Sequence, residues 1–281
     1  MLPFWASDVV LVSVQAALVC APQPQLPARL VDRLRGRAWA WVLLPGSLGG
    51  TIALLAAVPS LAGVYAWVAA LGVPLLAAVA IGSAARRTRA AGVLAVLSGG
   101  GLAAALLALA WAGPSSGLAA IPAQAAAVAL TALSAATLAA WLTRLAPSLV
   151  LQIALVAMAV LDCVLVFGHL LQGPNDTLNA ASAGGGLPHL QVAHFQHALM
   201  GYGDLFVAAV LGSLIAQSVP GAAGRAWPPR WTAALLVLGL SGIFDLLFLV
   251  VDTLPATVPV AVALLLMRLL PCCDRFATTN G

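Results

Sequence analysis

The sequence predicts an all-α polytopic membrane protein with about nine transmembrane helices. Hydrophobic residues make up 63% of its 281 positions and charged residues only 7%. A water-soluble domain carries about a quarter of charged residues, so this chain has too little charge to face water. The apolar segments are long and continuous instead of short and alternating, which favours helices over the strands of a barrel. The composition therefore indicates that the lipid bilayer is the solvent of this chain.

Nine segments are predicted to span the membrane. They cover residues 4–21, 39–59, 61–83, 91–112, 118–142, 147–171, 195–218, 231–251 and 254–270. The first segment is short and carries Asp8, and a signal peptide is the alternative interpretation of it. A signal peptide needs a basic region before its apolar core, whereas the first basic residue here is Arg29.

The arginines predict the orientation of these spans. With nine spans, every arginine falls in an alternate loop or at the C-terminal end, so all of them lie on one side. By the positive-inside rule the N-terminus is then outside and the C-terminus is cytoplasmic. The arginines form no stripe, which excludes a nucleic-acid partner. We predict a single membrane domain in a bacterial plasma membrane, with a scaffold at 1–146, catalytic helices at 147–270 and an extracytoplasmic loop at 172–194.

Three aspartates lie well inside predicted spans: Asp162, Asp204 and Asp245. A charge in hydrocarbon is costly, so each needs a function or a specific partner. Asp162 and Asp204 each lie about nine residues from the outer end of their span, and similar depths are expected for them. Two nearby carboxylates in a low dielectric share a proton, which supplies the base and the acid for peptide hydrolysis by water. Asp245 stands in no motif, and a bond to a neighbouring helix is its favoured interpretation.

The residues around this pair indicate how a substrate would be held. Glycines on both sides of Tyr202 let a backbone approach Asp204 closely. Pro255 and Pro259 interrupt the start of the last span and free backbone groups for an extended substrate. The predicted catalytic residues are Asp162 and Asp204, and the predicted substrate-binding residues are Gly201, Tyr202, Gly203, Leu254, Pro255, Ala256 and Thr257.

These motifs resemble those of the presenilin and signal peptide peptidase family of intramembrane aspartyl proteases. The Gly-Tyr-Gly-Asp at 201–204 matches the family's Gly-x-Gly-Asp signature, which opens the seventh of nine spans. The Val-Phe-Gly at 166–168 resembles the continuation after the first aspartate in signal peptide peptidases. The Pro-Ala at 255–256 matches the start of the family's Pro-Ala-Leu motif in the ninth span. The resemblance covers mainly residues 155–265.

The sequence departs from the family pattern at two positions. Leu161 stands where the family has a tyrosine before its first aspartate, and Thr257 stands where it has the leucine of Pro-Ala-Leu. The short interval between the aspartates and the predicted orientation are similar to those of signal peptide peptidases. The resemblance implies a presenilin-like fold, no cofactor, and membrane helices or remnant signal peptides as substrates. Prepilin peptidases share Gly-x-Gly-Asp, but they usually carry a basic residue where Leu205 and Phe206 follow here.

Two histidines are candidates for tuning the proton affinity of the pair. His169 and His197 each lie seven residues outward of the aspartate in their span, which is about two turns on the same helical face. Polar residues at the headgroups are the alternative interpretation. His189 and His194 complete a histidine cluster, but no His-Glu-x-x-His pattern exists and no metal is predicted.

Other function classes are kept as alternatives. A proton- or cation-coupled transporter would use Asp245 together with the aspartate pair. An inactive homologue that binds membrane helices fits the two departures from the motif. A rhomboid-type serine protease is disfavoured, because neither Ser213 nor Ser241 stands in Gly-x-Ser-x-Gly.

Overall fold

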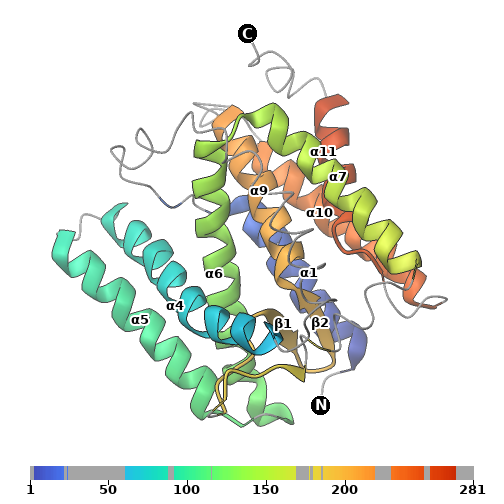
Figure 1. The fold of residues 1–281 in the computed structure, drawn as a ribbon. Coiled ribbons are helices and arrows are strands. Elements are labelled where there is room, and N and C mark those ends of the chain that lie inside the picture. Colours follow the sequence, from blue (N-terminus) through green and yellow to red (C-terminus); the bar gives the residue numbers. More distant parts are fainter. Residues whose placement is uncertain are drawn as a thin grey trace. The chain divides into compact units, whose positions relative to one another are not determined.

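Helices make up most of the chain in the computed structural model (Figure 1). The structure describes residues 3–21, 24, 61–87, 92–114, 116–168, 177, 180–184, 186–218, 229–249 and 254–269. The predicted span at 39–59 and most of the arginine-rich segment before it lie outside the described residues.

The described residues form eight α-helices, and their positions follow the long apolar segments of the sequence. The helices are α1 (Phe4–Cys20), α4 (Leu61–Arg87), α5 (Gly92–Ala112), α6 (Ile121–Leu145), α7 (Ser148–Phe167), α9 (Tyr202–Ser218), α10 (Pro229–Asp245) and α11 (Val258–Leu269). Short 3₁₀ turns at Leu118–Ala120 and Leu246–Leu249 precede α6 and follow α10.

Three of these helical segments are long and apolar enough to cross a membrane: Leu61–Ala85, Leu118–Leu145 and Ser148–Phe167. Further apolar helices are shorter, at Phe4–Cys20, Ser98–Ala112, Tyr202–Gln217 and Val258–Leu269. Large apolar side chains are also exposed at helical spacing, for example Val64, Val68, Leu71 and Leu75 on α4. Such a continuous apolar face suits lipid better than water. The nine-span count stays a prediction.

The chain divides into two compact units. Unit one comprises Met1–Leu11, Ser47–Leu138 and Leu171–Tyr202, and unit two comprises Val12–Gly46, Ala139–Leu170 and Gly203–Gly281. Helices α1 and α6 each contribute residues to both units. The predicted scaffold at 1–146 and the catalytic helices at 147–270 stay predictions.

Unit one is built on the hairpin of α4 and α5, which lie side by side in Figure 1. Their backbones meet at Gly99, where an added Cβ would lie 2.6 Å from the carbonyl oxygen of Ala78. Small residues at helix contacts allow this close approach. The core of the unit combines side chains from α4, α5, α6 and the segment before the strands: Val73, Ala77, Ala103, Leu130 and Leu190.

A β-hairpin stands where the sequence predicted the first two turns of a helix. Strand β1 (Val192–Phe195) pairs antiparallel with β2 (Ala198–Gly201), and α9 begins only at Tyr202. The prediction of a helix from residue 195 was therefore wrong, whereas the described chain is mostly helical, as predicted. Burial alternates along the strands, as it does on a half-buried sheet. Gln124 fixes the turn, since its Oε1 accepts from the backbone N of Gln196 at 2.9 Å and from its Nε2 at 2.8 Å.

Unit two combines the C-terminal part of α1 with α7, α9, α10 and α11. Helix α9 is buried along most of its length and packs directly on α1, where an added Cβ on Gly212 would lie 2.4 Å from the carbonyl oxygen of Val19. Helix α11 packs against both α7 and α10, as Figure 1 also shows. This packing brings the segment before α11 close to α7.

Candidate functional site

Asp162 and Thr257 form a direct contact within unit two. The hydroxyl of Thr257 donates to Oδ2 of Asp162 over 2.6 Å, which is the length of a strong hydrogen bond to a carboxylate. Asp162 is half-buried on α7, and Thr257 is 4% exposed in the turn before α11. The second departure from the family motif is therefore the residue that binds the first aspartate.

The local sequence explains why Thr257 lies in a turn. Pro255 lacks a backbone N–H and restricts the residue before it, so a helix does not begin upstream of it. The turn is closed by the N–H of Val258, which donates to the carbonyl oxygen of Pro255 over 3.2 Å. The N–H of Ala261 then donates to the carbonyl oxygen of Thr257 over 3.1 Å and starts α11. Thr257 is thus held at the helix start, where its side chain can reach α7.

Gln15 on α1 joins the same segment to Asp204. Its Nε2 donates to the backbone carbonyl oxygen of Ala256 over 3.2 Å and lies 3.5 Å from that of Asp204. Its Oε1 accepts from Ser241 on α10 over 3.5 Å. Gln15 is only 1% exposed. The residues that carry both predicted catalytic carboxylates are therefore linked through the segment at 254–257.

The start of α9 leaves room beside Asp204. Asp204 lies in the first turn of the helix and is half-buried. A Cβ added to Gly203 would meet nothing within 4 Å. The absence of a side chain at Gly203 thus leaves open space next to the aspartate, as close approach of a substrate backbone requires.

The remaining predicted site residues lie in several different elements of the two units. Tyr202 belongs to unit one, where its hydroxyl accepts from Ser134 over 3.1 Å, and Gly201 ends strand β2. In unit two, Leu254 is half-buried and Pro255 is buried. Asp245 ends α10 and has interactions of its own.

One of the two candidate histidines does not have the predicted position. His197 lies in the turn of the hairpin and is exposed, so the prediction that it shares a helical face with Asp204 was wrong. His169 lies outside the described residues. Nδ1 of His189 is 3.2 Å from Nε2 of Gln191. Within the described part of the chain, no three side chains gather as metal ligands.

Gln15 is the functional candidate that the sequence reasoning missed. The sequence does distinguish Gln15, because it is a polar residue within an apolar helix. Such residues usually have a specific partner. Asp8 in the same segment is charged but lies near the start of the helix.

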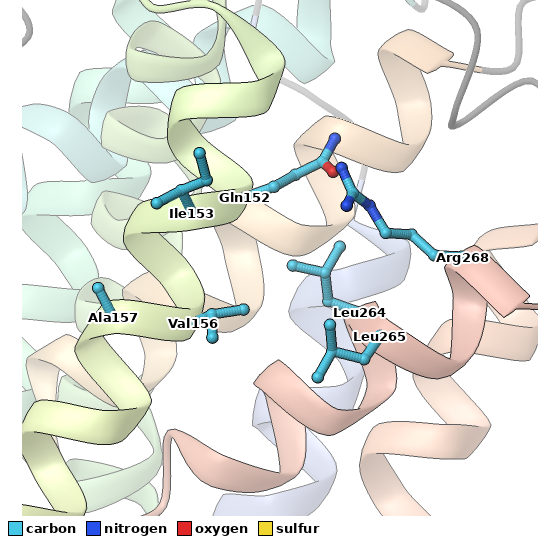
Figure 2. Close-up of a pocket in the computed structure, with 7 residues that line it drawn as sticks. All are labelled: Gln152, Ile153, Val156, Ala157, Leu264, Leu265 and Arg268. Atoms are coloured by element: carbon cyan, nitrogen blue, oxygen red, sulfur yellow. The ribbon is translucent and has the colours of Figure 1, made fainter.

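A separate hollow of about 310 Å³ lies between α7 and α11 (Figure 2). Most of its lining is apolar, and Gln152 and Arg268 lie at one end of it. The lining residues are Gln152, Ile153, Val156, Ala157, Leu264, Leu265 and Arg268. None of the predicted site residues lines this hollow, so we assign it no part in the chemistry.

No family model, curated protein or solved structure matches the chain. The resemblance to the presenilin and signal peptide peptidase family therefore depends on the motif residues themselves.

Proposed function

We propose that the protein is an intramembrane aspartyl protease, which hydrolyses peptide bonds within transmembrane helices or remnant signal peptides. The observation that supports this most is the hydrogen bond between Thr257 and Asp162. It joins two of the three motif segments on which the family resemblance depends. Gln15 links the third segment, at Asp204, to the same turn.

In the proposed reaction, Asp162 and Asp204 act on one water molecule. One carboxylate takes a proton from the water as its oxygen attacks the scissile carbonyl carbon. The other carboxyl gives its proton to the nitrogen of the leaving amine as the C–N bond breaks. The products are a carboxylic acid and an amine, and the reaction needs neither a metal nor a covalent intermediate.

The substrate in this proposal is a single membrane helix that is locally unwound. A helical peptide bond is shielded by its own turn, so the cleaved segment must be extended before water can attack it. The segment at 254–257 is the candidate to bind that extended segment. The carbonyl oxygens of Pro255, Ala256 and Thr257 each accept one hydrogen bond within unit two, and a carbonyl oxygen has a second lone pair with which a substrate N–H can pair. The open space at Gly203 would admit its backbone beside Asp204.

Cleavage of a model signal-peptide helix by the purified protein in detergent tests the proposal. We expect the wild type to cleave, and Asp162→Asn and Asp204→Asn each to lower kcat by about a thousandfold or more, since each removes one partner of the acid–base pair. Asp245→Asn is the matched control and should keep its activity.

Two results would contradict the protease. One is a wild type that is inert on several helices across a range of pH. The other is an Asp162→Asn or Asp204→Asn variant that still cleaves. Proton-coupled uptake into proteoliposomes that is lost in Asp245→Asn would instead identify a transporter.

A further inference from the structure

The buried amide of Gln15 has a demanding environment. A primary amide carries two N–H donors and a carbonyl acceptor, and burying it without partners is strongly unfavourable. Gln15 is 1% exposed on an otherwise apolar helix. Its presence there is explained only by what it binds.

Its partners come from three other segments of unit two. The two carbonyl oxygens near Nε2 belong to Asp204 at the start of α9 and to Ala256 in the turn before α11. The hydroxyl of Ser241 on α10 donates to Oε1. One side chain therefore uses both its donor and its acceptor sides to hold backbone and side-chain groups from separate elements.

These contacts reach the two backbone segments that carry or bind the predicted catalytic carboxylates. One carboxylate belongs to Asp204, whose own backbone carbonyl oxygen lies 3.5 Å from Nε2 of Gln15. Ala256 is the neighbour of Thr257, which donates to the other carboxylate. A shift of either segment would change the separation of the two carboxylates, and a misplacement of about 1 Å in an active site can cost about a hundredfold in rate.

We propose that Gln15 is a positioning residue, which holds the backbone of Asp204 and the segment at 254–257 in register so that the two aspartates can share one water. This inference rests on the proposed protease function. Gln15 touches no reacting atom and acts through the two segments that it binds.

Gln15→Met tests the inference, because methionine has a similar size and shape but cannot donate. Gln152→Met is the matched control, since Gln152 is also a glutamine in an apolar helix of unit two and is 3% exposed. Its Oε1 has no hydrogen-bond partner among the described residues. We expect Gln15→Met to lower kcat by roughly tenfold to a hundredfold with KM within about twofold, and Gln152→Met to change neither.

A second measurement does not depend on activity. The amides of Val258 and Ala261 close the turn at 255–257, so their hydrogen exchange reports the order of this segment. We expect exchange at both amides to be roughly fivefold faster or more in Gln15→Met, and unchanged in Gln152→Met. If Gln15→Met does not fold, Ser241→Ala replaces it, and we expect a loss of kcat of about fivefold.

The outcomes separate the two proposals. If the wild type cleaves and Gln15→Met, or its replacement Ser241→Ala, cleaves equally well with unchanged exchange, the role of Gln15 is rejected and the protease stands. If the wild type cleaves no helix, the protease is rejected, and the exchange rates alone decide whether Gln15 orders the turn. Equal losses in Gln15→Met and Gln152→Met would indicate a general packing effect and would also reject the positioning role.

Discussion

At the scale of single residues, Thr257 stands where the Pro-Ala-Leu motif has its leucine, and it binds a specific partner. A leucine at this position would only pack, whereas the threonine hydroxyl reaches Oδ2 of Asp162 over 2.6 Å. This hydrogen bond is shielded from water by the burial of Thr257, which strengthens it. The inactive-homologue alternative treats this departure as a loss, whereas in the structure Thr257 has a specific hydrogen-bond partner.

Removal of the Thr257 hydroxyl should lower the rate of catalysis. Thr257→Val keeps the branched shape but leaves the Asp162 carboxylate without its side-chain donor, and we expect kcat to fall by about tenfold. Thr257→Ser keeps the hydroxyl and should retain activity within about threefold. Steady-state cleavage of the same model helix measures both. If Thr257→Val matched the wild type, the hydroxyl would have no catalytic importance.

At the scale of elements, the contact between α1 and α9 holds Gln15 next to the start of α9. This contact depends on Gly212, which lies against the backbone of Val19. Helices approach this closely only where one of them lacks a side chain, as in other membrane-helix pairs. A methyl group at this position has no space, because the nearest atoms belong to the backbone and cannot rotate away.

Gly212→Ala should therefore destabilise the protein by about 1–3 kcal/mol, the usual cost of overpacking. Gly239→Ala on α10 is the control, because an added Cβ there meets nothing within 4 Å, and we expect no loss of stability and a gain of up to about 1 kcal/mol from the higher helix propensity of alanine. Unfolding of the two variants in detergent, followed by circular dichroism, gives the comparison. Equal stability of the two variants would contradict the close contact.

The hairpin is the element that the sequence reasoning assigned wrongly. Residues 195–201 are apolar enough to extend the following helix, and the turn between β1 and β2 at Gln196 and His197 contains no glycine or proline. The alternation of burial with period two distinguishes a strand from a helix, but it covers only a few residues here. The contact with Gln124 decides the local structure, and it comes from a distant part of the chain.

At the scale of the whole molecule, the orientation in the membrane is the main prediction that the sequence makes. A fluorescent protein fused to the C-terminus should fluoresce, because this end is predicted to be cytoplasmic. Alkaline phosphatase inserted near residue 180, in the predicted loop at 172–194, should be active, because that enzyme folds only outside the cytoplasm. The opposite pattern of the two reporters would overturn the predicted orientation and the count of spans on which it depends.

Composition and hydropathy by themselves determined the helical class, the positions of α4, α5, α6 and α7 within a few residues, and the choice of the aspartates as candidates. These features depend on local properties, since each apolar helix satisfies its own backbone hydrogen bonds. The nine spans, the orientation and the protease stay predictions.

Only the tertiary structure decided which polar groups meet. Thr257 and Asp162 are 95 positions apart, and Gln15 and Ala256 are 241 positions apart. No local pattern relates residues at such separations. Their contacts arise because α1, α7, α9, α10 and α11 pack in unit two with small residues at close helix contacts. Most buried polar groups then pair with one another, since they have no water to bind, and Oε1 of Gln152 is an exception.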